Sequence, residues 1–358
     1  MSDNDQETIE DEAEVTTEDE VVPLKYSITS YGADYPVDGL VKRLDENNIL
    51  IPHFQRGFVW KWTQASRFVE SLLLGLPVPG IFLSKDEDSQ KLIVIDGQQR
   101  LRTLQFFYSG IFADSGKEFR LRGVQEKYSG ATYSSLSEED KRRLNDSIIH
   151  ATIIRQDEPS EDDSSVYYIF ERLNTGGTLL NAQEIRASIY HGEFNSFLKE
   201  MNGQKEWREI IGPPHPRMKD QELILRFFAL YYEGSAYRRP MKEFLNLFMH
   251  RNRHLQKLPE EALSELFSTT VHTIRKHIGR DAFKPIRNLN TAFFDAIMIG
   301  VCRRMQKGPI EKPSELALRH KSLISDGSFM SACLKATADN ESVNRRLKMA
   351  IDAFGDVP

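Results

Sequence analysis

The segment from Lys91 to Thr103 constrains the fold of this chain most strongly, because an apolar, β-branched run ends at Asp96-Gly97 and an amphipathic run follows at once. This order predicts a strand, a tight turn and a helix. Such a turn presents the unpaired N–H groups and the positive dipole end of a helix, which favour an anion such as phosphate. Gly97 lets the backbone approach that anion closely, and Arg100 adds a charge with fork geometry.

The same residues admit a purely structural interpretation. Aspartate is a favourable N-cap residue, and Arg100 can pair with any nearby carboxylate. The functional interpretation gives Asp96 a role in holding Mg²⁺ or orienting a water, and uses the N–H groups of Gly97 to Gln99 to bind phosphate. The pattern alone leaves both interpretations open.

Length and composition define the class of protein. With 358 residues and 40% hydrophobic content, the chain can form a full core and two domains. Its apolar runs are shorter than the roughly 18–20 residues of a membrane span. The two cysteines, Cys302 and Cys333, are too few for a disulfide framework or a cysteine-rich zinc site. We therefore expect a soluble protein of the reducing cytoplasm with no membrane partner.

The acidic residues are concentrated at the N-terminus. Residues 1–22 contain ten Asp or Glu and no Lys or Arg, so the formal net charge of −6 becomes +4 once they are set aside. This segment has no apolar period, which predicts disorder. A basic body with an acidic arm suits a protein that meets polyanions and carries its own electrostatic competitor, although an acidic arm that only aids solubility gives the same pattern.

Hydrophobic periodicity divides the rest of the chain into a mixed part and a helical part. Up to about residue 190 we expect strands at 81–84, 92–95 and 147–155, the first two paired, interleaved with helices at 37–46, from Thr63 to Gly75, and at 100–108, 137–144, 164–173 and 181–190. Beyond this point the helical period predicts helices at 221–232, 241–251, 260–278, 291–305, 315–324 and 340–354. In the first of these, Glu222 and Arg226 lie at i,i+4 spacing, and we assign them to structure.

Two further segments carry polar residues in irregular sequence. Gln55-Arg56 is surrounded by aromatic residues without an obvious local acid, so Arg56 is expected to meet either an anion or a carboxylate from elsewhere in the chain. Asn174-Thr175-Gly176-Gly177 separates two predicted helices and places polar groups beside the second helix N-terminus. A helix C-cap followed by a turn explains the second segment equally well.

The order of these motifs resembles a known family. Ile51-Pro-x-x-Gln-Arg-x-x-x-Trp60, Ser71-Leu-Leu-Leu-Gly-Leu-Pro-Val-Pro79, Asp96-Gly-Gln-Gln-Arg-Leu-x-Thr-Leu104 and Phe170-x-Arg-Leu-Asn-Thr-Gly-Gly177 follow one another along the chain. This series closely resembles the ParB/sulfiredoxin-like N-terminal domain of GmrSD-type type IV restriction systems, and the GmrS-like subunit in particular. The resemblance covers residues 37–190.

That resemblance implies a ParB/sulfiredoxin-like mixed-sheet core. Together with the helical period after residue 190, it leads us to expect an α+β fold with an all-α C-terminal domain. The expected parts are a disordered acidic tail at 1–22, a nucleotide-binding domain at 23–190 and a helical domain at 191–358. It also implies that the core binds and hydrolyses nucleoside triphosphate with Mg²⁺. The implied catalytic residues are Asp96, Gln99 and Arg100, with Asp96 as the metal ligand. The implied nucleotide-binding residues are Gln55, Arg56, Gly97, Gln98, Asn174, Thr175, Gly176, Gly177 and Glu184.

The resemblance further implies a role in restriction of foreign, modified DNA. Fused members of the family carry a C-terminal HNH nuclease domain that this sequence does not show, so cleavage is expected to need a separate nuclease subunit, and homo-oligomers are possible. Two alternatives stay open: a non-catalytic DNA-binding or regulatory module, and a core that itself cleaves DNA. The role of Asp96 distinguishes the first alternative from an enzyme, because its carboxylate aids metal binding and hydrolysis but repels a DNA backbone.

Overall fold

The computed structural model describes residues 9–10, 27–52, 58–86, 89–158, 164–173, 180–285 and 288–358. The chain forms two compact units. One holds residues 25–180 and 187–189, and the other holds residues 1–24, 181–186 and 190–358. We call them the N-terminal unit and the helical unit.

The N-terminal unit is built on a mixed five-stranded sheet with the strand order β2-β8-β4-β5-β3. β2 pairs antiparallel with β8, β8 parallel with β4, β4 antiparallel with β5, and β5 parallel with β3. The five strands of this sheet are β2 (Ser27–Pro36), β3 (Ile49–Leu50), β4 (Ile81–Lys85), β5 (Leu92–Asp96) and β8 (Ile148–Glu158). Two short strands of the same unit, β6 (Ile111–Phe112) and β7 (Lys117–Glu118), pair with each other. Its helices are α1 (Val37–Asp45), α2 (Trp62–Leu73), α3 (Gln98–Ser109), α4 (Glu138–Asn145) and α5 (Ser164–Leu173).

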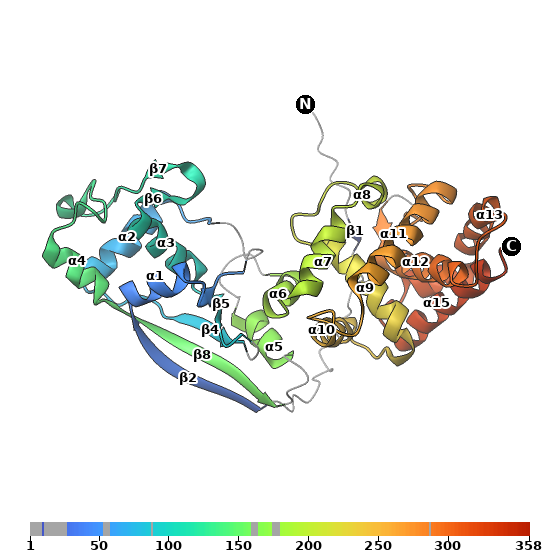
Figure 1. Cartoon of the computed structure of the whole chain (residues 1–358), viewed down its shortest axis with the longest axis horizontal. Coiled ribbons are helices and arrows are strands. Elements are labelled where there is room, and N and C mark those ends of the chain that lie inside the picture. The colour runs from blue at the N-terminus through green and yellow to red at the C-terminus, as the bar shows by residue number, and fades with distance from the viewer. Residues whose placement is uncertain are drawn as a thin grey trace. The chain divides into compact units, whose positions relative to one another are not determined.

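One face of this sheet carries the main core of the unit. Figure 1 shows α1, α2 and α3 on one side of the long β2–β8 pair. Alternation along β5 turns Leu92 and Val94 towards these helices, where both belong to the buried apolar cluster. Ile93 and Ile95 are buried on the other face, and α5 contacts both β5 and β8. Because β5 is covered on both faces, its sequence is a continuous apolar run and does not alternate between apolar and polar residues.

The predicted elements of this unit form, with one change at a helix start. The paired strands β4 and β5 are confirmed, as is the serine cap of α4, where Ser137 Oγ accepts a hydrogen bond from the Asp140 N–H at 3.1 Å. Thr63 is not the N-cap of α2, because the helix begins at Trp62 and its N-cap is Lys61. The Gln64 side-chain oxygen accepts a hydrogen bond from the Lys61 N–H at 2.8 Å, which replaces the threonine hydroxyl as the capping group.

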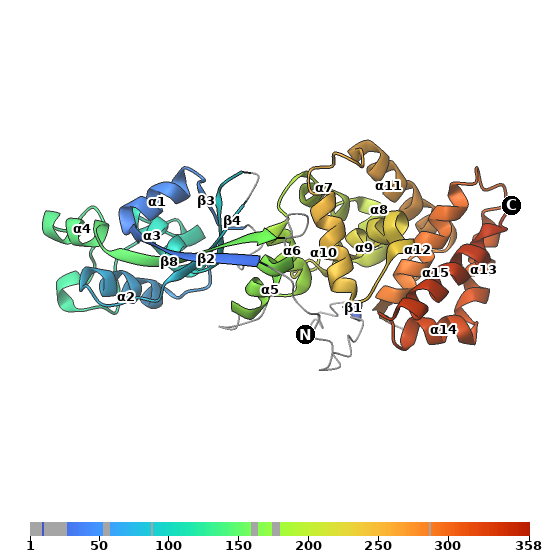
Figure 2. The same cartoon turned by 90° about the horizontal axis from the view of Figure 1, so that it is seen from below.

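The helical unit confirms the predicted all-helical C-terminal part, apart from one short strand pair (Figure 2). α12 packs against α9, α11 and α15. The unit contains α6 (Ala182–Ile189, shared with the other unit), α7 (Glu193–Asn202), α8 (Lys205–Ile211), α9 (Lys219–Glu233), α10 (Met241–Arg251), α11 (Glu260–His277), β9 (Leu289–Asn290), α12 (Thr291–Met305), α13 (Ser314–Ile324), α14 (Gly327–Leu334) and α15 (Asn340–Gly355).

The strand pair joins β9 to part of the acidic N-terminal segment. Ile9 and Glu10 form β1, which pairs in parallel with Leu289 and Asn290 of β9. The rest of residues 1–22 lies outside the described residues, so disorder of that segment stays a prediction. Among the helices that the structure describes, none combines the length and apolar character needed to traverse a lipid bilayer.

Charged pairs in α9 differ from the simple i,i+4 arrangement of the sequence. Glu222 pairs with Arg186 of α6, whose Nη1 lies 2.8 Å from Glu222 Oε2. Arg226 pairs with Asp295 of α12, with an Nη2–Oδ2 distance of 2.6 Å. Both residues are structural, as assigned, but they tie α9 to two different helices instead of to each other.

Candidate functional site

The turn between β5 and α3 has the geometry that its sequence predicts. β5 ends at Asp96, and Gly97 is the N-cap of α3 with φ 106° and ψ 4°. Two features of the structure disfavour any residue with a Cβ atom at position 97. The left-handed backbone disfavours L-residues, and a Cβ at Gly97 would lie 2.4 Å from Ile81 Cγ2. The close packing of this turn on β4 therefore requires glycine.

Among the described residues, no side chain caps the N-terminus of α3, so the part of the structural interpretation in which Asp96 caps this helix is wrong. Its other part, the pairing of Arg100 with a nearby carboxylate, is confirmed. The Asp96 carboxylate instead turns towards the next helical turn. Its Oδ2 lies 2.7 Å from Arg100 Nη2, and the same nitrogen donates to the carbonyl oxygen of Gly80 at 3.0 Å. Arg100 is thereby held at the end of the sheet where β5 ends and β4 begins.

The two side chains of the Asp96–Arg100 pair differ in exposure, and each has a polar atom without a described hydrogen-bond partner. The Asp96 side chain is 51% exposed and that of Arg100 is 15% exposed. Asp96 Oδ1 accepts no hydrogen bond from a described residue, and the buried Nε of Arg100 likewise has no described partner. A buried donor without a partner is unfavourable, so the turn offers both a free carboxylate oxygen and an unsatisfied guanidinium N–H.

Gln99 joins this turn to the aromatic segment that follows Gln55-Arg56. Its Oε1 accepts hydrogen bonds from the backbone N–H groups of Val59 at 3.0 Å and Trp60 at 3.2 Å. The described structure thus gives Gln99 an anchoring role, which its spacing in the sequence did not suggest. Its catalytic assignment stays a prediction.

We expect Gln99→Ala to lower the free energy of unfolding of the N-terminal unit by about 1–2 kcal/mol, because an exposed and a part-buried backbone donor both lose their acceptor. Gln99→Glu keeps an acceptor oxygen and should lose less. Urea denaturation followed by circular dichroism measures both. Gln105→Ala, which removes one exposed hydrogen bond to Asp45, is the control and should change stability by about 0.5 kcal/mol at most. If Gln99→Ala and Gln105→Ala lowered the free energy of unfolding equally, Gln99 would not have the anchoring role.

Several predicted site residues cannot be placed. Gln55, Arg56, Asn174, Thr175, Gly176 and Gly177 lie outside the described residues. The described residues on either side of Gln55-Arg56 are held in place: Leu50 pairs with Ile93 of β5, and Val59 is bound by Gln99. The assignment of all six residues to a nucleotide site stays a prediction.

Glu184 belongs to the helical unit, whereas Asp96 and Arg100 belong to the N-terminal unit. Its Oε2 accepts a hydrogen bond from the Asn181 N–H at 2.7 Å, and the Asn181 side chain accepts one from the Glu184 N–H at 2.9 Å. This capping box starts α6. The same carboxylate oxygen lies 2.8 Å from Arg217 Nη2. Glu184 is therefore engaged in a helix cap and an ion pair, and its contact with nucleotide stays a prediction.

Comparison with protein families bears on the N-terminal unit. The model described as "GmrSD restriction endonuclease, N-terminal domain" matches residues 37–191. Over these residues, which make up less than half of the chain, the sequence is similar to that domain. The matched stretch contains the β5–α3 turn with Asp96 and Arg100. A comparison with curated proteins gave no match.

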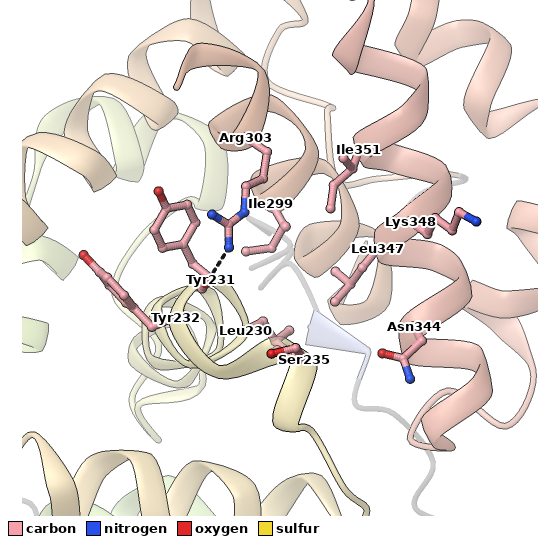
Figure 3. Close-up of a pocket in the computed structure, with 11 residues that line it drawn as sticks. Leu230, Tyr231, Tyr232, Ser235, Ile299, Arg303, Asn344, Leu347, Lys348 and Ile351 are labelled. Carbon is pink, nitrogen blue, oxygen red and sulfur yellow. Dashed lines mark hydrogen bonds between the residues drawn. The ribbon is translucent and has the colours of Figure 1, made fainter. Parts of the chain in front are cut away.

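The helical unit contains a pocket of about 280 Å³ between α9, α12 and α15 (Figure 3). Arg303 lies over the ring of Tyr231 at 4.1 Å and donates a hydrogen bond to its carbonyl oxygen at 2.5 Å. Burial raises the pKa of the Tyr231 hydroxyl above its ordinary value. The residues that line the pocket include none of the predicted GmrSD-type site residues, and we do not include it in the candidate site.

Proposed function

We propose that the GmrSD-type N-terminal unit binds and hydrolyses a nucleoside triphosphate with Mg²⁺, as the nucleotide-dependent component of a restriction system that acts on modified DNA with a separate nuclease subunit. The family match supports the restriction system and the interaction with DNA. The hydrolysis reaction, the metal and the nuclease partner are our proposal.

The observation that carries the proposal is the combination of groups at the β5–α3 turn. A half-exposed carboxylate, one oxygen of which has no partner among the described residues, lies beside an arginine whose Nε–H also has none, and Gly97 lets the backbone of the turn pack closely on β4. Arg100 and the first N–H groups of α3 would hold the phosphates. When a triphosphate displaces the Asp96 carboxylate from Arg100, that carboxylate becomes free to orient the attacking water.

The donor set fits a Mg²⁺ ion carried by the substrate. The described residues contain no group of three or more His, Cys, Asp or Glu residues placed to hold a metal. Mg²⁺ in nucleotide sites commonly takes one or two carboxylates, with water and phosphate oxygens in the remaining positions. Asp96 would supply that carboxylate, and the bound ion would offset charge on the phosphates.

Phosphate release tests the proposal directly. We expect the full-length protein with Mg²⁺ to release phosphate from at least one of ATP, GTP, CTP and UTP, measured with and without modified duplex DNA. Asp96→Asn, which keeps the shape but removes the charge, should lower the rate about a hundredfold. Asp45→Asn, an exposed aspartate at the end of α1 in the same unit, is the matched control and should leave the rate unchanged.

Two results would overturn the proposal. The first is an absence of phosphate release from all four triphosphates, even with DNA; if Asp96→Asn then also bound DNA more tightly, a non-catalytic DNA-binding module would explain the site. The second is a nucleotide-bound structure in which Arg100 still pairs with Asp96 and touches no phosphate. DNA cleavage by the purified chain alone would replace the separate nuclease subunit by activity of this core.

A further inference from the structure

Arg67 and Arg122 form a pair of exposed arginines on the N-terminal unit, away from the β5–α3 turn in sequence. Arg67 lies on α2, and Arg122 lies in the loop that follows β7. The two positions are tied together because the Arg122 N–H donates to Ser66 Oγ at 3.0 Å, and Ser66 immediately precedes Arg67. Arg67 Nε in turn donates to the carbonyl oxygen of Gly123 at 3.2 Å. We call these two side chains the Arg67–Arg122 patch.

Both guanidinium groups are held in place without being neutralised. The Arg122 guanidinium carbon lies 4.1 Å from the centroid of the Trp62 ring, and the Trp62 ring also stacks on Phe112 with 4.1 Å between centroids. The Trp62 Nε1 donates to the Arg120 carbonyl oxygen at 2.6 Å. An arginine over an aromatic face keeps its in-plane N–H groups available for another acceptor.

The carboxylates near this patch are engaged elsewhere. Within the described part of the chain, neither Arg67 nor Arg122 makes an ion pair, whereas their neighbour Arg120 pairs with Glu118 at 2.5 Å. Glu70, one turn after Arg67 on α2, accepts a hydrogen bond from the Gln125 N–H at 2.6 Å. The patch therefore presents, on a rigid support, two arginines that make no ion pair with a described residue, although the Glu70 carboxylate keeps its negative charge one turn away from Arg67.

We propose that the Arg67–Arg122 patch binds phosphates of the DNA backbone, an inference that rests on the proposed action on DNA. Arginine presents a planar fork of donors that matches phosphate oxygens. Because both side chains are already positioned, little conformational freedom is lost on binding. Contacts of this kind set affinity and orientation but carry no sequence information, so base or modification recognition lies elsewhere.

The salt dependence of DNA binding tests the patch. The affinity of the full-length protein for a labelled duplex is measured across a series of salt concentrations. Each phosphate contact contributes about 0.9 to the slope of log K against log salt. The double variant Arg67→Gln/Arg122→Gln should therefore show a slope smaller by about 2, with affinity reduced to a similar degree for every duplex sequence. The phosphate-release rate without DNA and the unfolding midpoint should stay close to those of the wild type.

Arg142→Gln is the matched control, because it removes a charge from an exposed arginine on α4 of the same unit and should change the slope by less than half as much per residue. An unchanged slope in the double variant, with wild-type DNA binding intact, would overturn the patch but not the proposed function. An absence of DNA binding by the wild type with any nucleotide would instead remove the basis for both. Binding of poly-glutamate at this patch in place of DNA would assign it to an acidic protein and overturn the proposal.

Discussion

Asp295→Ala is expected to lower the free energy of unfolding of the helical unit by about 3–5 kcal/mol. Asp295 of α12 is fully buried and pairs with two arginines that are themselves buried. Its carboxylate oxygens lie 2.6 and 3.0 Å from nitrogens of Arg226, and Oδ2 lies 2.9 Å from Arg346 Nη2. Removing the carboxylate leaves two guanidinium groups in the core without their counterion, which is more unfavourable than the loss of the pairs themselves.

Urea denaturation of the full chain, followed by circular dichroism and by tryptophan fluorescence, measures this loss. Of the three tryptophans, Trp207 is buried in the helical unit, whereas Trp60 and Trp62 report on the N-terminal unit. The matched control is Asp339→Ala. Asp339 also pairs with an arginine, Arg239, but their side chains are 47% and 51% exposed, and such a pair contributes at most about 1 kcal/mol. A similar small loss in both variants would show that water or a rearranged partner satisfies the buried arginines.

Gly97→Ala is expected to destabilise the N-terminal unit by about 2–6 kcal/mol. Left-handed backbone strain at a non-glycine residue contributes about 1–3 kcal/mol. Overpacking contributes a further 1–3 kcal/mol or so, because the new methyl would lie 2.4 Å from Ile81 Cγ2 and 2.9 Å from Ile81 Cβ. Neither Ile81 in β4 nor the start of α3 can move without disturbing the sheet.

Gly110→Ala separates these two contributions within the same helix. Gly110 is the C-cap of α3 with φ 80°, but a Cβ at this position would meet no atom within 4 Å. This variant should therefore show the backbone strain alone, about 1–2 kcal/mol. If Gly97→Ala were no more destabilising than Gly110→Ala in urea denaturation, the turn would not be packed as the structure shows, and the close backbone approach at the candidate site would be in doubt.

Hydrophobic periodicity predicted elements best where one face is buried against the rest of the chain. The bounds of α10 and α12 match the expected ranges, and β4 and β5 form the expected pair. In contrast, β2 was missed. Its residues are largely exposed, including Ile28 at 41% and Tyr31 at 44%, so it shows no clear apolar alternation. It becomes a strand because its backbone pairs along β8, a partner more than a hundred residues away.

The candidate site was also predicted only in part. The Asp96-Gly97 turn and the helix after it follow from local sequence, because a β-branched run, a glycine and an amphipathic run specify backbone conformations over a few residues. The partners of the site residues do not follow from it. Gln99 is bound to Val59 and Trp60, forty and thirty-nine positions away, and Arg100 is bound to the carbonyl of Gly80 as well as to Asp96. Nothing in the sequence marks those acceptors and donors.

The sequence by itself determined the α+β class, the change to helices after about residue 190 and the glycine at the β5–α3 turn, since each depends on local periodicity or backbone freedom. The tertiary structure alone decided which charges meet. Glu222 and Arg226 are suitably spaced to pair with each other, yet they bind Arg186 and Asp295. Periodicity specifies which face of a helix is buried but not which helix covers it, and buried charges pair with the counterion that the covering helix brings.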